Sequence, residues 1–179
     1  MLIRLCACEA MGGARLAELA LSRRNMAESG EAAEGEWSRA TYPLVVALHA
    51  AVIGGTFLFG RGRPRWGWIV LLIGAQPVRI WVLATLGRRW NTRAAVPAEM
   101  EIASGGPYAF VRHPNYTVVA VELLALPLAF GLRWLAVAGA VANAILLGPR
   151  IGEEEEALMR HPAYRSTMAR RKRFIPGVF

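Results

Sequence analysis

Two apolar stretches decide the fold: "YPLVVALHAAVIGGTFLFG" at residues 42–60 and "WGWIVLLIGAQPVRIWVLATL" at residues 66–86. Each is about 20 residues long, and a helix that rises about 1.5 Å per residue then covers the roughly 30 Å of a bilayer's hydrocarbon core. Only five residues, "RGRPR", separate them. The pair therefore predicts two membrane-spanning helices joined by a short polar connection.

Two shorter apolar stretches follow, at residues 116–131 and 134–148. Their separator, "GLR" at 131–133, is typical of a tight polar turn. We expect the two stretches to form one antiparallel helical hairpin, bounded by Tyr116 and Pro149. After Pro149 the chain is too charged to span a membrane and favours a helix up to Arg160.

The composition agrees with a membrane protein, because 55% of the 179 residues are hydrophobic and the mean hydropathy is +0.32. We expect one domain, residues 1–179. It divides into an N-terminal segment and polar connector (1–41), the membrane spans (42–148) and a tail on the cofactor side (149–179). Charged residues interrupt the opening segment, which predicts either an interfacial helix or a weak first span. The predicted fold class is all-α: a polytopic membrane helix bundle with four or five spans and a cytoplasmic C-terminal helix.

The net charge of +8 could suggest nucleic acid, but the basic residues lie between the apolar stretches and in the tail. If 116–148 is a hairpin, the connection 87–115 and the tail emerge on the same side of the membrane. The positive-inside rule makes that side cytoplasmic, although "RGRPR" places three arginines on the other side. We therefore expect no nucleic-acid partner.

The cysteines exclude two further classes of site. Cys6 and Cys8 are the only two in the chain, too close together for an ordinary disulfide and too few for a zinc site. No metal site is predicted.

Two ionisable residues stand inside apolar stretches and are functional candidates for that reason. Arg79 lies in the second stretch and Glu122 in the third, where a charge is costly without a partner or water. They could pair with each other or serve a ligand pocket, and Arg79 could also snorkel to the interface. Interhelical hydrogen bonding is the expected role of His49 and Asn143.

A short motif, "RHPNY" at 112–116, stands at the start of the third stretch and returns as "RHPAY" at 160–164. Pro114 suits the first turn of a helix, where its missing N–H has no partner to lose. Arg112 and His113 would then lie at the positive end of that helix, which favours an anionic group. The second copy follows a charged helix, so we expect its proline to end that helix.

Four consecutive glutamates, Glu153–Glu156, follow the predicted hairpin. Alone they would suggest a solvated acidic face. Closure of the hairpin could instead bring them within reach of His113, where carboxylates could bind ribose hydroxyls or an ammonium group.

Several stretches together resemble the bacterial branch of the isoprenylcysteine carboxyl methyltransferase family, which is related to the membrane phospholipid methyltransferases. They are "RIWVLATLGRRWN" at 79–91, "SGGPYAFVRHPNY" at 104–116, "LPLAF" at 126–130, "RIGEEEEAL" at 150–158 and "RFIPG" at 173–177. The similarity runs from about Leu19 to the C-terminus.

The resemblance implies a helical membrane enzyme, in a bacterial inner membrane, that uses S-adenosylmethionine to methylate a lipophilic acceptor. The predicted cofactor-binding residues match the family's turn motif and acidic pair: Tyr108, Arg112, His113, Pro114, Tyr116, Glu154 and Glu155. Arg79 matches an intramembrane arginine at the acceptor, and with Glu122 it forms the predicted catalytic pair.

The resemblance leaves the acceptor open. We expect O-methylation of a small lipid-like acid or of a phenol or pyrone hydroxyl, with membrane lipids as the other contacts. Three alternatives remain: a phospholipid N-methyltransferase, an NADPH-dependent membrane reductase of the sterol type, which shares a related Arg-His-x-x-Tyr turn, and a non-catalytic protein whose polar residues only pack helices.

Overall fold

The chain folds into a bundle of five long helices, seen in a computed structural model that describes residues 1–28, 32–97 and 102–177. The long helices are α1 (Leu2–Glu28), α2 (Glu36–Phe59), α3 (Trp66–Leu86), α4 (Pro114–Ala129) and α5 (Arg133–Met159). Smaller elements are the 3₁₀ turns η1 (Gly87–Arg89) and η2 (Gly106–Ala109), the helix α6 (Pro162–Met168), and two-residue strands β1 (Ala32–Ala33) and β2 (Val96–Pro97), which pair antiparallel. The prediction of an all-helical bundle is confirmed, apart from this short ladder.

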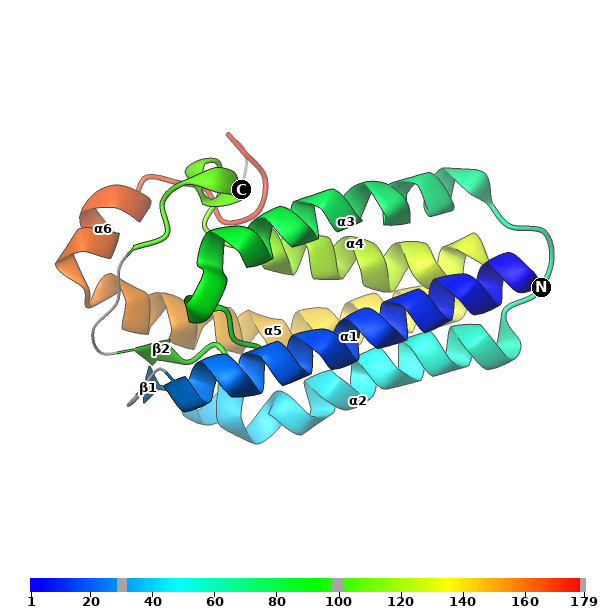
Figure 1. Ribbon diagram of the computed structural model, residues 1–179, viewed down its shortest axis with the longest axis horizontal. Helices are drawn as coiled ribbons and strands as arrows, with labels where there is room; N and C mark the ends of the chain where they lie inside the picture. Colours follow the sequence, from blue (N-terminus) through cyan, green and yellow to red (C-terminus); the bar gives the residue numbers. More distant parts are fainter. Residues whose placement is uncertain (29–31, 98–101, 178–179) are drawn as a thin grey trace.

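The five helices run alternately up and down the bundle, and the small elements gather at one end (Figure 1). We call this the α6 end. The other end is closed by backbone hydrogen bonds between the two short connections. There Arg61 N–H donates to the Phe130 carbonyl at 3.0 Å, and Arg65 N–H donates to the Ala129 carbonyl at 2.9 Å. The predicted turn after residue 131 is confirmed, with Gly131 at φ +83°.

Three helices, α2, the helical stretch 66–89 and α5, are long and apolar enough to cross a membrane by length and composition. The helix α4 is apolar but shorter, at 16 residues. It lies inside the bundle against α2, α3 and α5. Many large apolar side chains instead face outward, including Ile73 at 62% exposed and Val70 at 66%. An apolar exterior of this kind is what a lipid environment requires.

The helix α1 lies lengthwise along α2 (Figure 1). In its second half the buried residues are polar and large apolar residues face outward: Glu18, Ser22 and Asn25 are buried, whereas Leu16 and Leu21 are 69% and 38% exposed. Two of the charges that interrupt the opening segment, Arg15 and Glu18, therefore have partners inside the bundle, whereas Glu9 is exposed. In sequence this segment looked poorly apolar because its hydrophilic face is the buried one.

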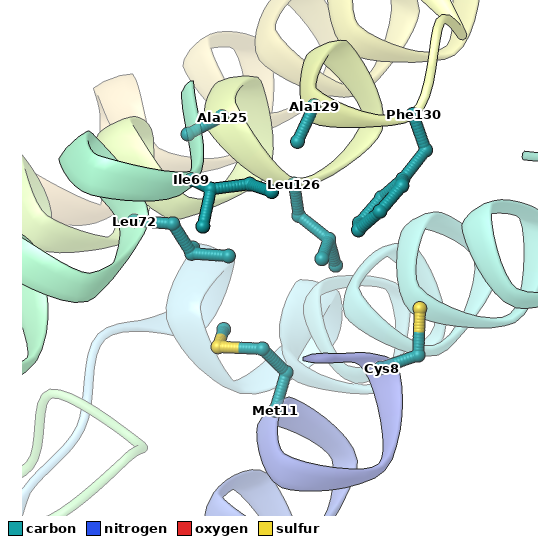
Figure 2. Packing of buried hydrophobic residues seen from close by; sticks show 8 residues of the cluster. All are labelled: Cys8, Met11, Ile69, Leu72, Ala125, Leu126, Ala129 and Phe130. Carbon is teal, nitrogen blue, oxygen red and sulfur yellow. The ribbon is translucent and has the colours of Figure 1, made fainter. Parts of the chain in front are cut away.

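An apolar core lies toward the end away from α6, where α1, α3 and α4 converge. Figure 2 shows its members: Cys8 and Met11 from α1, Ile69 and Leu72 from α3, and Ala125, Leu126, Ala129 and Phe130 at the end of α4. The small side chains of Ala125 and Ala129 are completely buried, which lets α4 approach its neighbours closely. This core joins α1 to the helices that carry the motifs.

Two predicted boundaries are wrong. The helix that contains the first apolar stretch starts before Tyr42, because α2 begins at Glu36. The helix α1 ends at Glu28; residues 29–31 lie outside the described part of the chain, as do 98–101 and 178–179. Pro149 does not end a helix, since α5 runs through it to Met159. A proline removes one hydrogen bond from a helix, and the long packed α5 tolerates that loss.

The second copy of the motif ends the Glu-rich helix as predicted, because α5 stops at Met159 with Arg160 at the C-cap, just before Pro162. In addition, Pro162 is the first residue of α6, with His161 at the N-cap. Both copies therefore place proline at the first position of a helix, where it suits the backbone. The two copies share this placement of proline, although the backbone ψ angle at the N-cap is 57° for His113 and 116° for His161.

Candidate functional site

The first copy of the motif forms a rigid turn at the α6 end. His113 is the N-cap of α4, and Pro114 is the first helical residue. The C-terminal segment ties this turn down, because Arg112 N–H donates to the Lys172 carbonyl and His113 N–H donates to the Arg173 carbonyl, both at 2.9 Å. The side chains of Arg112 and His113 are thereby fixed where the predicted helix begins.

At this turn one buried carboxylate, Glu155 of α5, contacts the side chains of His113, Arg112 and Arg173. His113 Nε2–H donates to its Oε1 at 2.9 Å, Arg112 Nη1 lies 3.1 Å from the same oxygen, and Arg173 Nη2 donates to Oε2 at 2.6 Å. The predicted approach of the acidic run to His113 is confirmed. The anion that the positive end of α4 attracts is thus the protein's own Glu155.

The four glutamates serve four different purposes, because successive residues of a helix point about 100° apart. Glu154 accepts a hydrogen bond from Tyr116 Oη at 2.6 Å. Glu153 accepts the backbone N–H groups of Trp37 and Ser38 at 2.8 and 2.9 Å, at the start of α2. Among the described residues, Glu156 pairs only with Arg160, at the exposed surface. The expectation of a uniform solvated face holds for Glu156 alone.

A cavity of about 540 Å³ connects these motifs with the middle of the bundle. Among the described residues, its polar lining at the α6 end includes five of the predicted cofactor residues, namely Tyr108, Arg112, His113, Tyr116 and Glu154. Toward the middle it reaches Arg79, and α1 and α2 provide an apolar wall that includes Leu16, Val46 and Ile53. A polar end and an apolar branch therefore share one space.

Two of the predicted cofactor-binding residues, Pro114 and Glu155, are not among the described residues that line the cavity. Pro114 fixes the start of α4, and Glu155 lies behind His113. Both therefore act on the cavity through the residues that they position.

Arg79 belongs to a buried network of charges from three helices. Its Nε donates to Glu18 Oε1 of α1 at 2.8 Å, and its Nη2 also bonds Glu18. Its Nη1 lies 3.6 Å from Glu122 of α4, too far for a hydrogen bond. The main partner is therefore Glu18, and the expected pairing with Glu122 is the weaker contact.

Glu122 is held by other groups and is not among the described residues that line the cavity. Its carboxylate accepts hydrogen bonds from Arg15 of α1 and, at 3.0 Å, from Gln76 Nε2 of α3. Arg79 does line the cavity, and its Nη1 is buried without a hydrogen-bond partner in the described part of the chain. A buried donor without a partner is costly, so this nitrogen is ready to bind a ligand atom.

Two residues that line the cavity, Arg150 and Tyr164, were not predicted from the sequence as site residues. Arg150 of α5 is 3% exposed; its Nη2 bonds the Thr92 carbonyl, while Nε and Nη1 have no partner among the described residues. Tyr164, from the second motif copy, is also buried, and its hydroxyl is likewise unpartnered within the described ranges. The only available signals were an arginine directly after an apolar stretch and the repeated motif itself.

Burial also sets the charge state of two phenols at the α6 end. It raises the pKa of Tyr108 and of Tyr164 well above the usual range, and the nearby carboxylate of Glu154 adds to both shifts. Both side chains therefore remain neutral hydrogen-bond donors at physiological pH.

The loop that carries Tyr108 packs tightly against α3. A Cβ atom at Gly106, where φ is +56°, would lie 2.4 Å from Thr85 Oγ1. Glycine in the "SGGPY" stretch thus allows the close approach that places Tyr108 on the cavity.

Comparison with known proteins supports the motif analysis. The family model of isoprenylcysteine carboxyl methyltransferases (ICMT) matches residues 68–160. The chain is also 31% identical over 153 residues to the uncharacterized protein YpbQ of Bacillus subtilis (strain 168), an alignment that covers 82% of this chain and 91% of YpbQ. The range that the family model matches contains Arg79, the first motif copy and the four glutamates.

Proposed function

The chain belongs to the isoprenylcysteine carboxyl methyltransferase family, and from this premise we propose that it methylates an oxygen atom of a lipophilic small molecule, with S-adenosylmethionine as the methyl donor. One observation carries the proposal. A single cavity joins a polar end, lined by the motif residues, to an apolar wall and to Arg79, whose buried Nη1 has no hydrogen-bond partner in the described part of the chain. A methyltransferase needs such a space, because donor and acceptor must meet there in line and away from water.

The residues at the polar end suit the chemistry of S-adenosylmethionine. That molecule carries a carboxylate, an ammonium group and ribose hydroxyls. The Nε and Nη1 atoms of Arg150 are buried donors without partners in the described part of the chain, which suits a carboxylate. Glu154 offers acceptor oxygens for the ammonium group or for hydroxyls.

The remaining predicted residues would hold this polar end in shape. Tyr116 positions Glu154, and Glu155 positions His113 and Arg112. When bound, the cofactor supplies a methyl group that is already activated by a positive sulfur. The protein then has to orient the acceptor, exclude water and stabilise the charge of the attacking oxygen.

Arg79 is the residue that would stabilise the negative charge on the attacking oxygen. Glu18 holds its Nε and Nη2, which leaves Nη1 for a carboxylate or phenolate oxygen of the acceptor. A charge-assisted hydrogen bond of this kind is strong inside a low-dielectric bundle. Glu122 acts by positioning, because it holds Arg15 beside Glu18.

The apolar wall supports an acceptor that comes from the membrane. Leu16 of α1 is 69% exposed and Val46 of α2 is 36% exposed on the bundle surface, yet both also line the cavity. A lipid-like molecule could therefore pass between α1 and α2 and keep its polar head near Arg79.

We also propose that all five long helices cross the membrane. The 27 residues of α1 correspond to about 40 Å of helix, and its outward face is apolar. Of the 21 Lys and Arg residues, fourteen lie at the α6 end, which favours a cytoplasmic location for this end. They are Arg23, Arg24, Arg39, Arg88, Arg89, Arg93, Arg112, Arg150, Arg160, Arg165, Arg170, Arg171, Lys172 and Arg173.

The experiment that tests this function is a cofactor titration on the purified protein in lipid nanodiscs. S-adenosylmethionine should bind, S-adenosylhomocysteine should compete, and NADPH should have no effect. His113→Ala should weaken binding, whereas the matched control His161→Ala, in the second motif copy, should not. Binding of NADPH without binding of S-adenosylmethionine would reject the methyltransferase and favour a reductase.

A further inference from the structure

His49 is a polar residue of the cavity lining to which the proposed function assigns no role. It lies on α2 and lines the cavity. Its Nδ1 lies 2.8 Å from the Val45 carbonyl oxygen, one turn earlier in the same helix. A carbonyl oxygen can only accept a hydrogen bond, so Nδ1 must carry the proton.

This hydrogen bond fixes the tautomer of the neutral ring. With the proton on Nδ1, the other nitrogen, Nε2, presents a lone pair. Within the described ranges, no residue forms a hydrogen bond with Nε2. The first expectation for His49, a hydrogen bond between helices, is therefore wrong: the bond stays within α2, and Nε2 remains available to a ligand.

His49 and Arg79 line the same cavity from two different helices, α2 and α3. A ligand in this space is therefore in reach of both helices.

Two arginines, Arg15 of α1 and Arg150 of α5, line the same cavity as His49. The carboxylate of Glu122 is bonded to Arg15 and is not among the described residues of this lining.

We propose that His49 is the general base that removes the proton of the acceptor hydroxyl, so that the acceptor is a phenol or a similarly weakly acidic hydroxyl compound rather than a carboxylic acid. This inference rests on the proposed function and specifies its substrate class. The O–H proton moves to Nε2 as the acceptor oxygen forms its bond to the methyl carbon. The bond between that carbon and sulfur breaks, and its electron pair stays on sulfur. The imidazolium later returns the proton to water.

The substrate class follows from acidity. A carboxylic acid titrates near pH 4 and is ionised at neutral pH, so it needs no base. A phenol titrates near pH 10 and stays protonated, so it does need one. A base whose ordinary pKa is close to neutral suits this task best. Arg79 Nη1 is then available for the phenolate oxygen as its charge develops.

The test compares wild type with His49→Gln on three acceptors that share one alkyl chain: a phenol, its nitro derivative and a fatty acid. The nitro derivative is already ionised at the assay pH. We expect His49→Gln to lower transfer to the phenol by about 100-fold or more and transfer to the nitro derivative far less. The matched control His161→Gln should behave as wild type, and binding of S-adenosylmethionine should be unchanged in both variants.

A second readout does not depend on turnover. In protein with ¹⁵N-labelled histidine, His49 Nε2 should resonate as an unprotonated nitrogen. It should shift when the phenol is added together with S-adenosylhomocysteine. A protonated Nε2 in the resting protein would overturn the inference, and this measurement on wild type does not require that a variant folds.

The outcomes separate the two proposals. Equal transfer to the phenol by wild type and His49→Gln, an equal loss on the phenol and its nitro derivative, or transfer to the fatty acid alone would overturn the role of His49 and leave the methyltransferase intact. Absence of both transfer and S-adenosylmethionine binding in wild type would reject the proposed function, and the inference with it.

Discussion

Glu18 of α1 and Arg79 of α3 form an ion pair inside the bundle, with Arg79 Nε 2.8 Å from Glu18 Oε1 and a second contact through Nη2. The two residues are 61 positions apart, and both are less than 10% exposed. The pair joins α1 to the rest of the bundle and holds Arg79, a residue of the cavity lining, in place.

Loss of one partner should therefore be expensive. We predict that Glu18→Ala lowers the free energy of unfolding by about 3–5 kcal/mol, because a buried arginine loses its main counter-charge. Thermal unfolding in nanodiscs measures this. The control Glu28→Ala removes an exposed pair with Arg24 and should cost at most about 1 kcal/mol. Equal stability of the two variants would contradict the assigned role of α1.

Glu153 should matter for stability and not for the cofactor. Its carboxylate accepts the N–H groups of Trp37 and Ser38 at the start of α2, as an N-cap side chain does. Glu153→Ala should lower the free energy of unfolding by about 0.5–2 kcal/mol and leave the affinity for S-adenosylmethionine unchanged. A large loss of affinity at unchanged stability would place Glu153 in the binding site instead.

The neighbouring Glu154 should show the reverse behaviour. It lines the cavity and accepts a hydrogen bond from Tyr116. Glu154→Gln should reduce the affinity for S-adenosylmethionine by about tenfold or more, the equivalent of one charged hydrogen bond. Isothermal titration measures this, with Glu156→Gln as the surface control. If both variants bind as wild type does, Glu154 has no part in cofactor binding.

Arg150 provides a separate test of the cofactor carboxylate. We expect Arg150→Met to weaken binding of S-adenosylmethionine more than binding of an analogue that lacks the carboxylate. The difference arises because only the full cofactor has an anion for Nε and Nη1 to bind. The same loss for both ligands would indicate that Arg150 only supports the fold.

The five-span arrangement predicts opposite locations for the two ends of the bundle. A reporter inserted in the connection 61–65 should lie outside the cytoplasm, and one attached after the α6 helix should lie inside. Paired alkaline phosphatase and fluorescent protein fusions measure this. Identical locations for both reporters would contradict an odd number of spans between them.

The sequence predicts the helices whose outward faces are apolar, since length and hydropathy suffice for 42–60 and 66–86. It does not predict the place of α1, because Arg15 and Glu18 gain their partners only when α3 and α4 pack against them. The boundary predicted at Pro149 is wrong for a related reason. A proline commonly ends a helix because it removes a backbone hydrogen bond, but the packing of α5 against its neighbours stabilises the helix beyond this point.

The candidate site likewise contains residues that the sequence predicts and residues that only the structure reveals. The pattern of the sequence singled out the first motif copy and the run of four glutamates, and the resemblance to the family selected Glu154 and Glu155 from that run. The structure brings Tyr116 to Glu154 and His113 to Glu155. Arg150 and Tyr164 have no pattern that separates them from other residues of a basic tail. Their importance depends on burial and on unpartnered atoms, which only the folded chain reveals.

The most direct test of the central claim is transfer of a radiolabelled methyl group from S-adenosylmethionine into the organic-extractable lipids of membranes that contain the protein. We predict label in that fraction with wild type, a strong reduction with His113→Ala, and no reduction with His161→Ala. Mass spectrometry of the labelled product then identifies the acceptor. Equal label in membranes with and without the protein, in the presence of the organism's own lipid extract, would contradict the assignment as a methyltransferase of lipophilic acceptors.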